Sequence, residues 1–187
     1  AVTICQNEYV GVKVVLFHDA DFYRELAQAI TSNILRSFCD RFSPEEIKHA
    51  VDNMLFKRFN TSLGPSIRDC SGHLIHDLVE KLRGAAHYAV VFNEGDPKFA
   101  YPSNADSITV AANLQQLIFA IQEVSNLTND VPFELVVESN QLFSHIALIG
   151  STIVILQIRK QVHSQEIVDK IKHTLDMVKL CAQTADC

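Results

Sequence analysis

Three short apolar runs in the last third of the chain are separated by turn-forming residues. The runs cover residues 133–138, 142–149 and 152–159, with breaks at Ser139-Asn140-Gln141 and Gly150-Ser151. Asn and Gly tolerate the positive φ angles of tight turns, and Val, Ile, Leu and Phe are frequent in strands buried on at least one face. The pattern therefore predicts a three-stranded antiparallel meander at the centre of one sheet.

Helical and strand patterns alternate on both sides of this meander. The predicted elements from residue 66 onward are a helix over 66–83, a strand over 87–93, a turn at 94–97, a short strand over 98–101, a helix over 104–127, the meander, and a closing helix over 164–181. Two strands and three strands separated by a long helix predict one five-stranded antiparallel sheet flanked by helices, which is an α/β (α+β) fold.

The N-terminal third predicts a different segment. Residues 9–17 have the pattern of a strand with no obvious mate, and residues 22–42 carry apolar side chains at helical spacing. Ser43, with proline next and Glu46 three residues on, is typical of a capping box and predicts a second helix. The turn-rich stretch 60–65 predicts a connector. The expected organisation is a β-α-α segment over 1–60, a domain over 65–182 and a tail over 183–187.

This order of elements resembles that of the roadblock/LC7 family and of the related longin fold. The stretch HYAVVFNEGDPKFAYPSNAD at 87–106 is similar to the opening hairpin of a roadblock domain, and the long helix and β-β-β-α ending correspond as well. The resemblance covers about residues 65–182. A longin domain ends β-α-α, so the resemblance also allows residues 1–60 to be the tail of a preceding longin-like unit.

The predicted helix over 104–127 is unusual because it lacks a charged face. Between residues 108 and 128 the only charged residue is Glu123. A helix whose back faces water normally carries charge there, so this helix is expected to be covered on a second side. Its apolar stripe consists of Val110, Leu114, Leu117, Ile121 and Val124. The resemblance implies that this stripe is a partner interface, whereas the alternative is that the N-terminal helices cover it.

Charge and composition exclude several classes of function. The net charge of −6 argues against general affinity for nucleic acids, and no apolar run approaches the ~20 residues that span a bilayer. No signal peptide is visible. The cysteines are scattered, odd in number and never in a C-x-x-C pair, which predicts reduced thiols in a cytoplasmic protein. They are Cys5, Cys39, Cys70, Cys181 and Cys187.

Candidate chemistry is sparse. His73 and His76 stand three apart on one helix, which suits a shared metal ion, but no third ligand is spaced to join them, so neither a metal nor a cofactor is expected. The nucleophile-elbow and phosphate-binding glycine motifs are absent from the sequence. The sequence therefore predicts no enzyme, and an active site would have to be assembled from distant positions.

The first functional hypothesis is a non-enzymatic interaction or scaffold subunit. The resemblance implies a trafficking, ciliary, lysosomal or dynein-type assembly, at the cytosolic face of a membrane or on the cytoskeleton. It implies a homodimer or a heteromeric roadblock/longin pair, and recruitment or regulation of a small GTPase. The alternative is a small-molecule-sensing domain of PAS, GAF or profilin-like architecture, with His87, Tyr88 and His145 lining the pocket.

Overall fold

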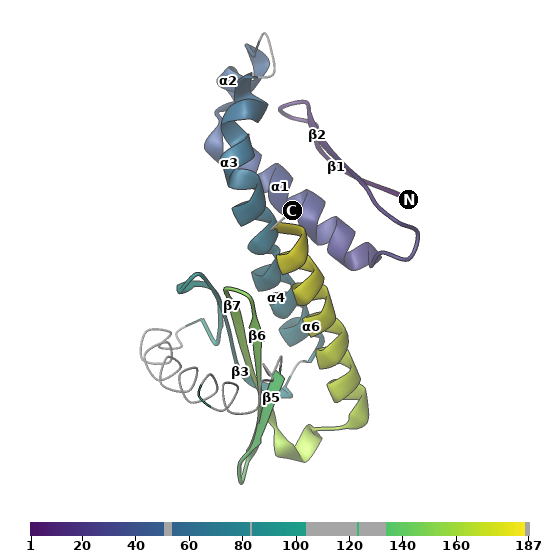
Figure 1. Ribbon diagram of the computed structural model, residues 1–187, viewed down its shortest axis with the longest axis vertical. Helices are drawn as coiled ribbons and strands as arrows, with labels where there is room; N and C mark the ends of the chain where they lie inside the picture. The colour runs from purple at the N-terminus through teal and green to yellow at the C-terminus, as the bar shows by residue number, and fades with distance from the viewer. Residues whose placement is uncertain (51–53, 83, 104–122, 124–133, 186–187) are drawn as a thin grey trace. The chain divides into compact units, whose positions relative to one another are not determined.

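The computed structural model describes residues 1–50, 54–82, 84–103, 123 and 134–185 (Figure 1). The chain forms two compact units. The first comprises Ala1–Leu74 with Asp176–Cys187, and the second comprises Ile75–Leu175. The boundaries fall inside helices α4 (Cys70–Lys81) and α6 (Gln165–Ala185), so both helices contribute to both units.

The first unit begins with a β-hairpin. Its other elements are helices, and the full set is β1 (Val2–Asn7), β2 (Val12–Phe17), α1 (Arg24–Arg41), α2 (Pro44–Lys48) and α3 (Met54–Arg68). The two strands are antiparallel and are drawn in purple in Figure 1. The prediction of a single strand over 9–17 without a mate was wrong, because β1 pairs with it. The sequence of β1, VTICQN, alternates too weakly to be recognised as a strand.

The core of the first unit lies between the hairpin, α1 and α3. Three phenylalanines meet there: the ring centroid of Phe38 lies 4.9 Å from that of Phe42 and 5.3 Å from that of Phe59. Val12 of β2 and Leu55 of α3 are buried in the same cluster. The large aromatic side chains therefore join two helices and one strand in a single apolar core.

The capping box at Ser43 is confirmed, but the elements after it differ from the prediction. Ser43 Oγ accepts from Glu46 N at 3.2 Å, and Ser43 N donates to Glu46 Oε2 at 2.9 Å. This helix, α2, nevertheless ends at Lys48, and α3 then runs through the predicted connector at 60–65. Pro65 lies inside α3 because burial of the apolar residues on either side outweighs the loss of one backbone hydrogen bond. The predicted helix 66–83 is consequently divided between α3 and α4.

The second unit contains the five-stranded antiparallel sheet that the sequence predicted. Its strands are β3 (Ala86–Asn93), β4 (Asp96–Tyr101), β5 (Glu134–Glu138), β6 (Leu142–Ile149) and β7 (Thr152–Arg159). Their order across the sheet is β4-β3-β7-β6-β5, and all neighbours are antiparallel. Gly95 and Gly150 adopt the positive φ angles that the two tight turns need. The central strands are therefore β3, β7 and β6, while β4 and β5 form the edges.

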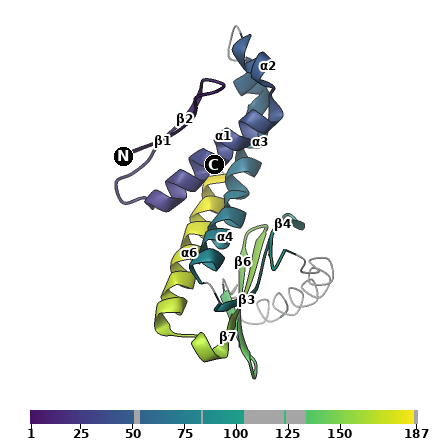
Figure 2. The same ribbon diagram turned by 180° about the vertical axis from the view of Figure 1, so that it is seen from behind.

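Both faces of this sheet carry buried apolar residues. One face presents the cluster of Val90, Phe92, Ile146 and Ile155, and the strand alternation puts Ala89, Val91, Val154 and Leu156 on the other face, where they are fully buried. Within this unit, the adjoining parts of α4 and α6 lie along one side of the sheet in both views (Figures 1 and 2). A sheet buried on both faces explains the nearly continuous apolar runs in β3 and β7.

Several predicted features lie outside the described residues. They include the helix over 104–127 and its stripe of Val110, Leu114, Leu117, Ile121 and Val124, so the stripe stays a prediction. In the described part of the chain, no helix combines the length and apolar character needed to cross a membrane.

The helical cysteines behave mostly as the sequence indicated. Cys70 and Cys181 are fully buried free thiols in the first unit, and Cys39 is half-buried. Cys181 Sγ donates to the carbonyl oxygen of Ile67 at 2.7 Å. A hydrogen bond with Cys181 and burial raise the pKa of the Cys70 thiol well above its usual range. Cys70 is therefore a packed thiol rather than a nucleophile.

Candidate interaction edge

The strand β5 is an edge of the sheet and leaves apolar side chains exposed. Val136 is 52% exposed and Val137 43% exposed. An edge strand presents unpaired backbone groups to which another strand can add. The opposite edge, β4, contains Pro97 and Lys98, two residue types that hinder such addition. Of the two edges, β5 is therefore the better suited to accept a second chain.

The backbone groups that β5 directs outward follow from its pairing with β6. Ser139 N donates to the carbonyl oxygen of Leu142 at 2.9 Å, which closes the hairpin with a hydrogen-bonded pair. Hydrogen-bonded and non-hydrogen-bonded pairs alternate along an antiparallel ladder. The N–H and C=O groups of Glu134, Val136 and Glu138 therefore point away from β6, toward the free edge.

The two acidic residues of β5, Glu134 and Glu138, each contact a basic side chain of the same unit. His145, which is buried in β6, hydrogen-bonds through Nδ1 to Glu134 Oε1 at 2.8 Å. At the other end of the strand, Lys160 forms an ion pair with Glu138. Lys160 Nζ also lies 5.7 Å from the centroid of the Phe143 ring. Lys160 thus compensates the negative charge of Glu138, whereas Glu134 is held by a hydrogen bond from His145.

A second histidine extends this arrangement beyond the sheet. His163 follows the short 3₁₀ helix Lys160–Val162 and stacks on Phe143 with ring centroids 4.0 Å apart. Its Nε2 lies 3.4 Å from Nε2 of His145. The Glu134 carboxylate can only accept, so His145 carries a hydrogen on Nδ1. A hydrogen bond between the two Nε2 atoms needs one donor and one acceptor, so protonating both rings breaks it.

Burial lowers the pKa of His163 from its ordinary value near 6.5, and the charge on His145 lowers it further, while Glu138 acts in the opposite direction. The unfolded state therefore binds more protons than the folded state once the pH falls below about 6.5. We expect the free energy of unfolding to decrease as the pH falls below 6.5, as measured by urea denaturation at a series of pH values. The variant His163→Phe retains the aromatic stack and is expected to show a shallower decrease. An identical slope in both proteins would contradict this role.

His73 and His76, which stand three apart on α4, contact different partners. His73 Nε2 lies 3.2 Å from Asn33 Oδ1, whereas His76 contacts Asp77 and packs edge-on against Phe99. Among the residues that the structure describes, no three histidine, cysteine or acidic side chains are placed to hold a metal ion.

The predicted pocket residues of the sensing alternative do not converge. Tyr88 packs with the Val90 cluster on one face of the sheet, and His145 belongs to the opposite face. His87 is exposed at an irregularity between β3 and β7. The geometry offers no support for a single ligand pocket lined by all three.

Comparisons with known proteins agree with this description of the fold. No family model matches the sequence, and no curated protein matches it either. Solved structures do match: MglB of Myxococcus xanthus has a TM-score of 0.54 at 11% identity, over 64% of this chain and 91% of that chain. The gliding protein MglB of Thermus thermophilus has a TM-score of 0.50 at 15% identity, over 61% and 92%. A roadblock/LC7 domain from Streptomyces avermitilis scores 0.46 at 15% identity, over 58% and 94%. The likeness to the two MglB structures shows the fold, and the predicted roadblock/LC7-like fold is confirmed.

Proposed function

We propose that this chain is a non-enzymatic interaction module that pairs with a second polypeptide along the free edge of β5. The observation that carries the proposal is the exposed Val136, whose backbone groups point outward from a strand in which both carboxylates have a partner. Strand addition at such an edge supplies backbone hydrogen bonds for affinity and side-chain contacts for specificity. The uncharged stripe around Leu117 on the predicted helix 104–127 would add an apolar contact beside the strand.

The sequence resemblance extends the proposal to a cellular role. We propose a scaffold subunit of a trafficking, ciliary, lysosomal or dynein-type assembly that recruits or regulates a small GTPase in the cytoplasm. The partner is a second copy of this chain or a different roadblock/longin-like chain, not a nucleic acid. We assign this role to residues 65–182, with 1–60 as an N-terminal extension and 183–187 as a tail. A roadblock-like fold is compatible with many roles, so the β5 edge has to be tested directly.

The geometry of β5 suggests how two copies would meet. If two β5 strands pair antiparallel about a twofold axis through Val136, Glu134 of one copy lies opposite Glu138 of the other. Like charges in that position normally destabilise a pair. Here His145 and Lys160 accompany the two carboxylates within each copy, so a symmetric pair remains feasible.

The proposal is tested by the mass of the chain in solution, measured by light scattering across a dilution series. Val136→Pro removes an outward N–H without removing any bond to β6, so we expect it to shift the dimer toward monomer at least tenfold in Kd. Val136→Thr keeps both the N–H and the branched side chain and is expected to retain the dimer. Leu117→Asp tests the helix in the same assay. If the folded Val136→Pro and Leu117→Asp proteins keep the wild-type mass and partner binding, the proposed interface is wrong.

A further inference from the structure

The β1–β2 hairpin of the first unit has one face of exposed apolar side chains. Val2 lies opposite Phe17, and Ile4 lies opposite Val15, so these four side chains share one face. Their exposure ranges from 40% at Val15 to 78% at Phe17. The opposite face of the hairpin packs on α1. Exposed apolar side chains gathered on one face of a two-stranded sheet indicate an interaction surface.

The hairpin also directs backbone groups outward along β2. Ala1 N donates to the carbonyl oxygen of His18 at 2.7 Å, and His18 N donates to that of Ala1 at 3.2 Å. These two reciprocal bonds show that Ala1 and His18 form a hydrogen-bonded pair. Hydrogen-bonded and non-hydrogen-bonded pairs alternate along an antiparallel ladder, so this pair determines which residues of β2 bond to β1 and which point outward. The alternation directs the N–H and C=O groups of Lys13, Val15 and Phe17 away from β1, toward the free edge of β2.

An apolar groove of about 280 Å³ runs beside this free edge. Its lining comes from β2, α1 and α3 and is apolar except for Lys13 and Asn60; the apolar members are Val12, Val14, Ile34, Phe38, Phe56, Phe59 and Leu63. The Phe56 ring stacks on Phe38 with centroids 5.3 Å apart and is nevertheless 60% exposed. Apolar side chains of α3 thus line the groove beside β2, just as α1 packs against the hairpin itself.

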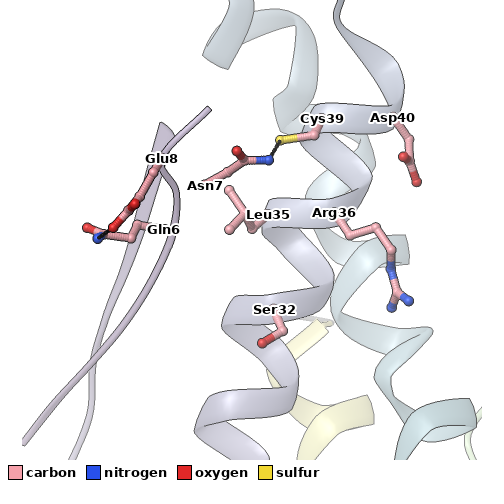
Figure 3. A pocket seen from close by; sticks show the side chains of 8 residues that line it. All are labelled: Gln6, Asn7, Glu8, Ser32, Leu35, Arg36, Cys39 and Asp40. Atoms are coloured by element: carbon pink, nitrogen blue, oxygen red, sulfur yellow. Dashed lines mark hydrogen bonds between the residues drawn. The ribbon is translucent and has the colours of Figure 1, made fainter. Parts of the chain in front are cut away.

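The other edge of the hairpin offers a different environment. The pocket beside β1 is lined by three charged residues, Glu8, Arg36 and Asp40, together with Gln6, Asn7, Ser32, Leu35 and Cys39. Asn7 Nδ2 donates to Cys39 Sγ across it at 3.7 Å (Figure 3). An apolar strand added there would remove water from the charged groups of Glu8, Arg36 and Asp40, which is costly. Of the two edges of the hairpin, β2 is therefore the one at which outward-pointing backbone groups lie beside an apolar groove.

We propose that β2 accepts a third β-strand from another polypeptide, which lies in the groove over α3. The alternate side chains of this strand that face Phe56 and Phe59 are apolar. An acidic side chain on its outer face pairs with Lys13, the one charged residue of the groove. A second copy of this hairpin does not fit in the groove. Its β2 packs on its own α1, and that α1 would need the space that α3 of the first copy already fills. This surface is separate from the β5 edge and does not depend on it.

The test uses the whole chain and the fluorescent peptide Val-Glu-Val-Thr-Val-Thr-Val, which carries valines on one face and glutamate on the other. Binding is followed by fluorescence polarisation at peptide concentrations up to about 1 mM. The control peptide has the same composition with its valines contiguous. We expect the alternating peptide to bind, the control to bind at least tenfold more weakly, and the Val15 amide to become protected from hydrogen exchange.

Matched variants distinguish peptide binding at this surface from non-specific binding. Val15→Pro removes an outward N–H of β2, and Ile4→Pro removes the corresponding N–H of β1, while both leave the bonds within the hairpin intact. Phe56→Ser alters the groove, and Met54→Ser alters a residue of similar exposure, 55% against 60%, outside its lining. With folding verified by circular dichroism, we expect binding to fall at least tenfold in Val15→Pro and Phe56→Ser only. No binding by the wild-type chain, or equal losses in Ile4→Pro and Met54→Ser, would overturn the proposal.

Discussion

Replacing Phe38 by alanine is expected to lower the free energy of unfolding by about 3–5 kcal/mol. Phe38 is 3% exposed and contacts the rings of Phe42, Phe56 and Phe59, so its removal opens a cavity where the hairpin, α1 and α3 meet. Chemical denaturation followed by circular dichroism measures this loss. Phe56→Ala removes the same chemical group from an exposed position and is expected to cost about 1 kcal/mol or less. Equal costs for the two variants would show that these aromatic residues do not form the core of the first unit.

Removing the carboxylate of Glu134 is expected to cost about 1–3 kcal/mol, because the buried Nδ1–H of His145 then loses its acceptor. The variant Glu134→Leu tests this, again by chemical denaturation. Replacing both partners with apolar residues, in Glu134→Leu/His145→Phe, removes the unsatisfied donor together with its acceptor. The double variant is therefore expected to be more stable than Glu134→Leu alone. Additive losses would mean that the two side chains contribute independently and that Glu134 does not fix His145.

The sheet of the second unit was predictable because its turns are encoded locally. Gly95 and Gly150 mark two of the hairpins, and strongly apolar runs lie on either side of them. The first unit was less predictable. Gly64 and Pro65 are strong turn formers, yet they lie inside α3, where packing outweighs local preference. The strand β1 has so few large apolar residues that only its partner β2 reveals it.

The candidate edge could be predicted only in part. Ser139 pairs with Leu142 through a two-residue turn, and this register places Val136 opposite His145. The three-residue break at 139–141 read from the sequence would instead place Val136 opposite Ser144, so the contact between His145 and Glu134 was not predictable from it. The position of β5 at the edge depends on how β3 inserts next to β7, which is a long-range pairing that a local pattern does not encode. His163 joins the arrangement through the stack on Phe143, a tertiary contact without a sequence signature.

The two exposed strand edges have a common physical basis. In β2 and in β5, the residues whose backbone groups point outward include an exposed valine, Val15 or Val136. The two sites differ in what lies beside the edge. An apolar groove lies beside β2, whereas paired carboxylates accompany β5. The two edges are therefore expected to select different partners, one an extended apolar strand and the other a second roadblock-like sheet.

The most direct test of pairing at β5 is amide hydrogen exchange at Val136 and Val137, measured by NMR at concentrations above and below the association midpoint. The Val137 amide is bonded to β6 and should be protected at every concentration, so it serves as an internal reference. The Val136 amide points outward, and we expect it to gain protection in parallel with the solution mass. If the mass doubles while the Val136 amide continues to exchange freely, the chain associates through another surface and the assignment of β5 is wrong.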